Sequence, residues 1–166
     1  NLVVKMITVD KDADGEHIHV EHTSVVLGDR FVLTFQEEHE GDVFDALRKR
    51  LRDPRSRIRQ LGADFLAYAV CDAVVDHYFA VLEWVGDRAE QLEEQVLTQP
   101  EPRQLARIYW LRREITYFRK QVWPLRDGLG MVMRSDSGRI SPAVVPFLRD
   151  VHDHTVQVVE SIEVYR

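Results

Sequence analysis

The sequence predicts an α/β (α+β) fold: a small antiparallel sheet with helices, followed by a long antiparallel helical hairpin and the start of a further long helix. Three observations support this prediction. Runs rich in β-branched residues, divided by turn-forming residues, occupy positions 2–35. Apolar residues then recur at alternating intervals of three and four, from Tyr68 to Val96 and again from Ile108 to Val132. The intervening segment carries prolines that separate the two helices.

The first region predicts three strands. Leu2–Val9 leads into the turn-forming residues 10–15, and Ile18–Leu27 and Phe31–Phe35 complete the sheet. Gly28-Asp29 has the composition of a two-residue hairpin turn, in which glycine supplies a positive φ.

A short helix follows the strands. Asp42 is expected to cap Val43–Leu51, and the Asp53-Pro54 step ends the helix. A basic cluster lies here, comprising Arg48, Lys49, Arg50, Arg52, Arg55, Arg57 and Arg59. Because no glycine-rich loop accompanies the cluster, we expect a solvated or acid-facing surface rather than a phosphate site.

The longest predicted helix, Gly62–Gln99, organises the chain. Its apolar seam comprises Tyr68, Cys71, Val75, Tyr78, Leu82, Val85, Ala89, Leu92 and Val96. A seam with this spacing packs against another helix. Its polar side is acidic, with Asp64, Asp72, Asp76, Glu83, Asp87, Glu90, Glu93 and Glu94 set against Arg88.

The second long helix carries a matching seam and the opposite charge. The seam comprises Ile108, Leu111, Ile115, Phe118, Val122, Leu125, Leu129 and Val132. The cations are Arg103, Arg107, Arg112, Arg113, Arg119, Lys120, Arg126 and Arg134. The two seams predict an antiparallel hairpin in which Val85 lies near Ile115 and Leu82 near Phe118. We expect ion pairs between the helices to specify this alignment.

The last helix has two distinct faces. Ser141-Pro142 resembles a helix start. Its apolar face comprises Val151, Thr155, Val158, Ile162 and Tyr165, and its polar stripe comprises Asp150, His154, Gln157 and Ser161. Such a helix is expected to contact both its own domain and something else.

Composition limits the classes of function. With 166 residues, 45% hydrophobic and 30% charged, the chain is globular. A net charge of −6 argues against nucleic-acid binding, so the expected partners are cations or further copies of the chain. The single cysteine, Cys71, excludes a disulfide framework and thiolate zinc clusters. No membrane helix or signal peptide is expected here. Because the chain opens without methionine and stops inside an apparent helix, we interpret it as part of a longer protein.

Candidate chemistry centres on Asp72 and Asp76, the only formal charges in Phe65–Leu82. Carboxylates in so apolar a segment need a partner, because an unpaired buried charge is strongly destabilising. Three interpretations stay open: bonds to arginines, a general acid/base pair, or ligands for a hard cation such as Mg²⁺. The last helix carries a second acidic group, comprising Asp150, Asp153 and His154.

Other candidate sites are weaker. His17 and His19 share one strand face at the spacing of a metal-binding pair, but no third ligand lies nearby, so we interpret them as exposed strand histidines. The sequence contains no P-loop, HExxH, nucleophile-elbow or Rossmann signature, and we therefore expect no enzymatic activity.

Five segments, taken in order, resemble the cytoplasmic domain of CorA-type magnesium/cobalt transporters. They are VLGDRFVLTFQE, GDVFDALRKRLR, GADFLAYAVCDAVVDHYF, VWPLRD and VPFLRDVHDHTVQVVESIEVYR. The resemblance covers roughly Glu21–Arg166. It implies a homopentameric funnel in which a mixed α/β domain and long helices hang below a two-helix membrane pore. Residues 1–166 would form a single cytoplasmic domain fragment: sheet and short helix (1–60), hairpin (61–134) and the start of a stalk helix (140–166). The stalk would reach the membrane through residues beyond Arg166.

The resemblance also implies metal sites. Asp72 in CDA and Asp150 in LRDVHD match family residues that hold Mg²⁺ between neighbouring subunits, and His154 matches a family histidine near that site. Asp76 is expected to be structural. The implied ion is Mg²⁺, with Co²⁺ or another divalent cation as alternatives.

The implied function is a feedback gate at the cytoplasmic face of the cell (inner) membrane. Opposed carboxylates of adjacent protomers repel each other unless a divalent ion bridges them, so abundant Mg²⁺ would hold the pore closed. The alternatives are a ZntB-like zinc transporter, which would share the fold, a coiled-coil interaction module with a basic partner, and a carboxylate-metal hydrolase.

Overall fold

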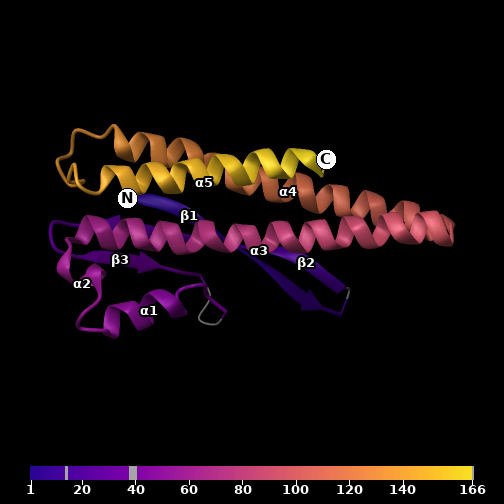
Figure 1. The fold of residues 1–166 in the computed structure, drawn as a ribbon, viewed down its shortest axis with the longest axis horizontal. Helices are drawn as coiled ribbons and strands as arrows, with labels where there is room; N and C mark the ends of the chain where they lie inside the picture. The colour runs from indigo at the N-terminus through magenta and orange to yellow at the C-terminus, as the bar shows by residue number, and fades with distance from the viewer. Residues whose placement is uncertain (14, 38–40, 166) are drawn as a thin grey trace.

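The sheet has three antiparallel strands, as the sequence predicted. The computed structural model describes residues 1–13, 15–37 and 41–165. The strands are β1 (Leu2–Asp12), β2 (Gly15–Leu27) and β3 (Val32–Phe35). They lie in the order β1-β2-β3 (Figure 1). Pairing of β1 with β2 continues to Asp12 opposite Gly15, so both strands run further into the predicted turn than expected. Asp14, within that turn, lies outside the described residues.

The connection between β2 and β3 differs from the predicted two-residue turn. Residues 28–31 separate the strands, and the Gly28 amide donates a hydrogen bond to the Phe31 carbonyl at 2.9 Å. The predicted positive φ at Gly28 was wrong, since the described glycines with positive φ are Gly15, Gly41 and Gly138. Glycine at position 28 instead leaves room for the Phe31 ring, since a Cβ there would lie 2.4 Å from the ring as it is placed and would require the ring to move.

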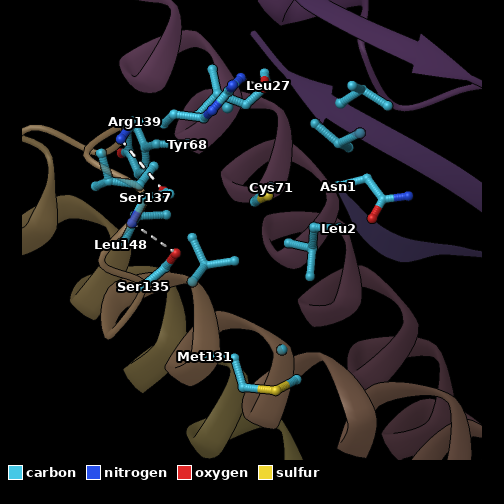
Figure 2. Close-up of a pocket in the computed structure, with 16 residues that line it drawn as sticks. Asn1, Leu2, Leu27, Tyr68, Cys71, Met131, Ser135, Ser137, Arg139 and Leu148 are labelled. Atoms are coloured by element: carbon cyan, nitrogen blue, oxygen red, sulfur yellow. Dashed lines mark hydrogen bonds between the residues drawn. The ribbon is translucent and has the colours of Figure 1, made fainter. Parts of the chain in front are cut away.

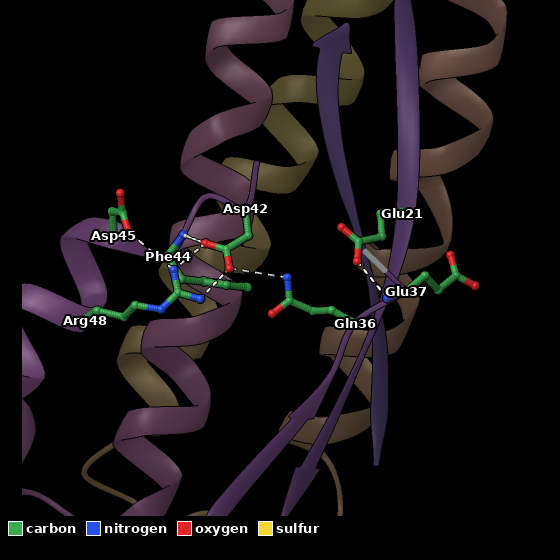
Figure 3. Close-up of polar contacts among 7 residues, drawn as sticks. All are labelled: Glu21, Gln36, Glu37, Asp42, Phe44, Asp45 and Arg48. Carbon is green, nitrogen blue, oxygen red and sulfur yellow. Dashed lines mark hydrogen bonds and ion pairs between the residues drawn. The ribbon is translucent and has the colours of Figure 1, made fainter. Parts of the chain in front are cut away.

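The first helix starts later than predicted. α1 spans Asp45–Arg52, follows Phe44 at its N-cap, and receives no side-chain cap from the described residues. The Asp42 carboxylate instead accepts a hydrogen bond from the Phe44 amide at 3.0 Å and forms an ion pair with Arg48 (Figure 3). Hydrogen bonds from the Arg48 guanidinium hold the pKa of Asp42 below its usual value. Asp42 therefore braces the segment before α1 rather than capping Val43–Leu51. The single-turn helix α2 (Arg57–Gln60) follows.

Three long helices pack on the sheet. α3 (Ala63–Thr98) and α4 (Pro102–Met133) form the predicted antiparallel hairpin, and α5 (Val145–Val164) runs beside both (Figure 1). α5 starts at Val145 rather than at Ser141-Pro142, because the Ser141 carbonyl accepts a turn hydrogen bond from the Val144 amide at 2.9 Å. By length and composition α3 is also the one described helix able to cross a membrane, but half of its apolar window is buried, as in a core helix.

A buried amide ties α3 to α4 at the tip of the hairpin. Glu101 and Gln104 form a capping box at the start of α4. The Gln104 amide nitrogen also donates to the Gln95 and Gln99 carbonyls, at 3.0 and 2.7 Å. Because this buried side chain is fully hydrogen-bonded, it fixes the turn without an energetic penalty.

The predicted seams form the core along most of the hairpin. The residues of the two predicted contacts, Val85, Ile115, Leu82 and Phe118, are all buried. The Tyr78 ring meets the Phe118 ring edge-on, with centroids 6.1 Å apart. The seams were predicted too far towards the tip, where Val96 and Ile108 are 38% and 42% exposed. The tip projects beyond the sheet and α5, so neither of them covers it (Figure 1).

The predicted ion pairs across the hairpin were wrong. Among the described residues no ion pair joins α3 to α4. The charged side chains that do pair are Arg88 with Glu16, Arg103 with Glu101, Arg119 with Glu163 and Arg126 with Asp127. Packing of the apolar seams and the Gln104 amide fix the alignment, which leaves the charged faces of both helices directed outward.

Polar bonds fasten the sheet to the helices. The Tyr78 hydroxyl donates to the Lys5 carbonyl at 2.5 Å, and the Trp84 indole donates to the Glu16 carboxylate at 3.0 Å. The bond from Trp84 and the guanidinium of Arg88 hold the pKa of Glu16 below its usual value. The β1–β2 hairpin is therefore held to α3 at both main-chain and side-chain positions.

Truncating the seam should destabilise the protein strongly. Replacing Leu82 or Phe118 by Ala should lower the free energy of unfolding by about 2–5 kcal/mol, because each leaves a cavity in a packed core. Urea denaturation measures this change. Leu97→Ala is the control: Leu97 is 76% exposed on the same helix, and its loss should cost no more than about 0.5 kcal/mol. Losses that small at Leu82 and Phe118 would show that the hairpin seam is not the core.

Candidate functional site

Asp72 is a partly desolvated carboxylate on the core helix. It lies on α3, half-buried, and accepts a hydrogen bond from the Tyr68 hydroxyl at 3.2 Å, one helical turn away. Burial raises the pKa of Asp72, and the negative charge of Asp76 raises it further. The Tyr68 bond and the charges of His154 and Arg50 oppose this rise without reversing it. The ionised form of Asp72 is therefore held at an energetic cost, which an added cation would relieve.

An aromatic cluster places α5 beside this carboxylate. The Tyr68 ring lies 5.1 Å from that of Phe65 on α3 and 5.3 Å from that of Phe147 on α5. Burial and the charges of Asp72 and Asp150 raise the pKa of Tyr68 to about 12. Asp150, exposed on α5, therefore acts electrostatically on the side chain that bonds Asp72.

His154 is held by packing rather than by hydrogen bonds. Its ring meets the Phe79 ring edge-on at a centroid distance of 6.0 Å. Its Nδ1 atom is buried and has no hydrogen-bond partner among the described residues. A buried imidazole nitrogen without a hydrogen-bond partner can, when unprotonated, bind a proton or a metal ion through its lone pair.

These residues do not close a metal site within one chain. In the described part of the chain, no group of three or more His, Cys, Asp or Glu side chains is arranged to hold a metal ion. His154 acts electrostatically on Asp72, and both Asp72 and Asp150 act on Tyr68, yet the three residues remain an incomplete donor set. The polar stripe of α5 is also only partly covered, with Asp150 and Gln157 exposed. Additional ligands would have to come from outside this set.

Arginine pairing, one of the open interpretations of Asp72 and Asp76, does not occur among the described residues. Both carboxylates and Arg50 line a cavity of about 320 Å³ between α1 and α3. Neither forms an ion pair there, and Arg50 acts on Asp72 only through its charge. Asp76 is exposed, so burial does not demand a structural partner for it. The acidic pair is thus left available for a mobile cation.

His17 and His19 each face one carboxylate of the neighbouring strand, and no third ligand joins them in a metal site among the described residues. His17 Nδ1 lies 3.5 Å from Asp12 Oδ2, and His19 Nδ1 lies 3.8 Å from Asp10 Oδ2. Both histidines are half-buried rather than exposed. Each imidazole bridges the paired strands β1 and β2, which gives it a structural role.

An apolar cavity beside the sheet shows no catalytic arrangement among the described residues. It measures about 630 Å³, is mostly apolar, and lies between the sheet, α3 and the end of α4 (Figure 2). Burial raises the pKa of the Cys71 thiol in its wall to about 12, so the thiol stays protonated and unreactive. Arg139 at the rim faces Asp29 at 3.6 Å and donates to the Leu27 carbonyl.

Sequence reasoning missed the immediate partners of Asp72 and His154. The Tyr68–Asp72 spacing of four residues signals a possible bond along a helix face. Arg50 and Phe79 carry no such signal, because their proximity depends on how α1 and α5 dock on α3.

Comparison with known proteins places the chain in one family. The profile of the family described as "CorA-like Mg2+ transporter protein" matches residues 1–166. The "Cobalt/magnesium transport protein CorA" of Thermotoga maritima is 41% identical over 165 residues, which are 99% of this chain and 46% of that protein. The chain thus spans about half the length of this relative.

Solved structures share the fold. The soluble domain of CorA from Methanocaldococcus jannaschii superposes with a TM-score of 0.69 and 19% identity, covering 97% of this chain and 69% of that one. The complete CorA magnesium transporter of the same organism gives a TM-score of 0.74 at 19% identity, over 99% of this chain and 51% of that one. At this identity the likeness concerns the fold alone.

The raised pKa of Asp72 predicts the sign of a pH effect. A carboxyl group whose pKa is raised by folding stabilises the fold below its unfolded pKa and loses that contribution as pH rises through the folded value. In a chelator at pH 7, Asp72→Asn should therefore raise the melting temperature by a few degrees, because asparagine can still accept the Tyr68 bond. The difference should shrink as pH falls towards about 4, where the aspartate is also neutral.

Thermal unfolding at both pH values measures this effect, and Asp87→Asn, an exposed carboxylate on the same helix, is the control. A lower melting temperature for Asp72→Asn at pH 7 would mean that the carboxylate makes a stabilising bond in the fold.

Proposed function

Because this chain belongs to the CorA-like Mg²⁺ transporter family, we propose that it is the cytoplasmic domain of a divalent-cation transporter and senses Mg²⁺ between subunits. The observation that carries the proposal is the incomplete site of Asp72, Asp150 and His154, two carboxylates and an imidazole that one chain does not complete. The polar stripe on α5, which its own domain covers only in part, supports a contact with a neighbouring copy.

The chemistry of the donors fits a hard cation. Mg²⁺ and Ca²⁺ prefer carboxylate oxygens, and Mg²⁺ commonly retains several waters, so a few protein ligands suffice. Asp150 is exposed, and partial burial already disfavours the charge of Asp72. A bound cation would remove that penalty. The His154 Nδ1 atom would also suit Co²⁺ or Zn²⁺, which accept imidazole readily.

The proposed mechanism is a charge-controlled interface. In a homopentamer, Asp72 of one copy and Asp150 of the next would approach each other and repel when no ion is present. A bridging Mg²⁺ would convert this repulsion into attraction and hold the interface closed. α5 would transmit the change to the membrane, since it is the helix that continues beyond Arg166 in this proposal. The chain would lie at the cytoplasmic face of the cell membrane and would carry no catalytic step.

Mg²⁺ should stabilise the protein through Asp72 and Asp150. Binding adds RT ln(1 + [L]/Kd), about 1.4 kcal/mol per site at ten times Kd, so the melting temperature should rise by about 2–4 °C for a chain of this size. The double variant Asp72→Asn plus Asp150→Asn should lose this response. The shift is read by calorimetry in EDTA and then in Mg²⁺.

The matched control is Asp87→Asn plus Asp136→Asn, which removes the same charge from exposed positions outside the site and should keep the Mg²⁺ response. An undiminished shift in the Asp72/Asp150 variant would refute the assignment of both residues. A larger shift with Zn²⁺ than with Mg²⁺, lost on His154→Ala, would favour the zinc-transport alternative.

A further inference from the structure

We propose that the exposed faces of α3 and α4 are complementary docking surfaces, and that the acidic face of one copy of this chain binds the basic face of another. The inference deepens the proposed function, because it names a contact between copies that is separate from the metal site. It rests on charges that the fold leaves unpaired.

The acidic face lies along one side of α3. It is defined by Glu83, Asp87, Glu90 and Glu94, all exposed. These positions recur at helical intervals, so they share a side of the helix opposite the buried seam. None of them forms an ion pair within the described part of the chain. The face is therefore a continuous row of unneutralised carboxylates.

The basic face lies on α4 and is partly aromatic. It surrounds a surface hollow of about 510 Å³, which is lined by Tyr109, Arg112, Arg113, Thr116, Tyr117 and Lys120. Tyr109 and Tyr117 are 58% and 40% exposed. Arg112, Arg113 and Lys120 form no ion pair with any described residue. Exposed tyrosine and arginine side chains are typical of protein interfaces, because they supply contact area and hydrogen bonds together.

The spacing of the charges matches between the two faces. Glu83 and Glu90 are seven residues apart on α3, and Arg113 and Lys120 are seven apart on α4. Seven residues are about two turns, or about 10.5 Å along a helix axis. One helix laid along the other can therefore oppose two carboxylates to two cations at once.

The two faces cannot satisfy each other within one chain. The buried seams and Gln104 fix the hairpin so that no ion pair joins α3 to α4 among the described residues. A chain that presents both signs on different surfaces can bind its own copies head to tail, and such contacts close into a ring when the rotation allows. Anionic lipid would fit only the basic face and would leave the acidic face unmatched, which favours a second copy as the occupant.

Charge reversal tests the proposal. Sedimentation velocity in EDTA at low ionic strength should show self-association of the wild type that weakens with added salt. Glu83→Lys plus Glu90→Lys, and separately Arg113→Glu plus Lys120→Glu, should each weaken it at least about tenfold through like-charge repulsion. The variant with all four changes should recover association, because complementarity returns with the signs exchanged.

The control reverses exposed aspartates away from both faces, Asp29→Lys plus Asp136→Lys, and should associate as the wild type does. Equimolar mixing of the two double variants gives a second reading, since they should bind each other although neither binds itself. A wild type that is monomeric throughout, or a fourfold variant without recovery, would overturn the proposal.

Binding to phosphatidylglycerol vesicles tests the alternative that the basic face binds anionic lipid. Loss of vesicle binding by Arg113→Glu plus Lys120→Glu, with unchanged self-association, would assign the basic face to lipid and overturn the second-copy proposal. Because the series is run in EDTA, its failure leaves the Mg²⁺ response of Asp72 and Asp150 intact as a separate result.

Discussion

Burial of one helix, α3, is the constraint on which the rest of the structure depends. α3 contacts every other helix and strand of the fold. Val74 and Tyr78 on this helix are completely buried, and the Tyr78 hydroxyl also bonds the main chain of β1. A long helix gains most of its stability from such packing rather than from its own propensity. The sheet, α4 and α5 are therefore arranged as the partners that α3 requires.

The same constraint explains why Asp72 is chemically distinctive. Because α3 is packed on several sides, the Asp72 carboxylate is half-buried at the surface of the core helix. Partial burial and the charge of Asp76 raise its pKa, and the bond from Tyr68 compensates only in part. A partly buried charge without an ion-pair partner disfavours folding, and residues of this kind are expected at functional sites. An ion bound at Asp72 could affect how α3 and α5 are placed, since α5 brings Asp150 and His154 to the same region.

Charge in this protein is segregated by surface rather than neutralised within the fold. The ion pairs that do form lie at the margins, such as Glu16 with Arg88 between β2 and α3 and Arg119 with Glu163 between α4 and α5. The outward faces of α3 and α4 keep opposite signs. Exposed ion pairs contribute little to folding, so leaving these groups unpaired has little effect on the stability of one chain. The unpaired charges do, however, create electrostatic fields at the surface that can steer association with a partner.

The sequence by itself determined the elements and their pairing. Runs rich in β-branched residues, divided by turn-forming residues, predicted the three antiparallel strands, and the 3,4 spacing predicted α3, α4 and the buried seam that includes Leu82 and Phe118. These features depend on which residues leave water, a preference that each side chain carries locally. The resemblance of five segments also identified Asp72, Asp150 and His154 as the candidate site before any geometry was known.

Only the tertiary structure decided the details that depend on distant neighbours. The Phe31 ring, rather than a positive φ, distinguishes the surroundings of Gly28, and Asp42 pairs with Arg48 instead of capping the helix. Val96 and Ile108 follow the seam pattern yet are 38% and 42% exposed, towards the end of the hairpin that projects beyond the sheet (Figure 1). The charged faces turn outward because seam packing, which is stronger than exposed ion pairing, sets the rotation of each helix. Which surfaces are covered is a property of the assembled elements, and no local pattern in the chain encodes it.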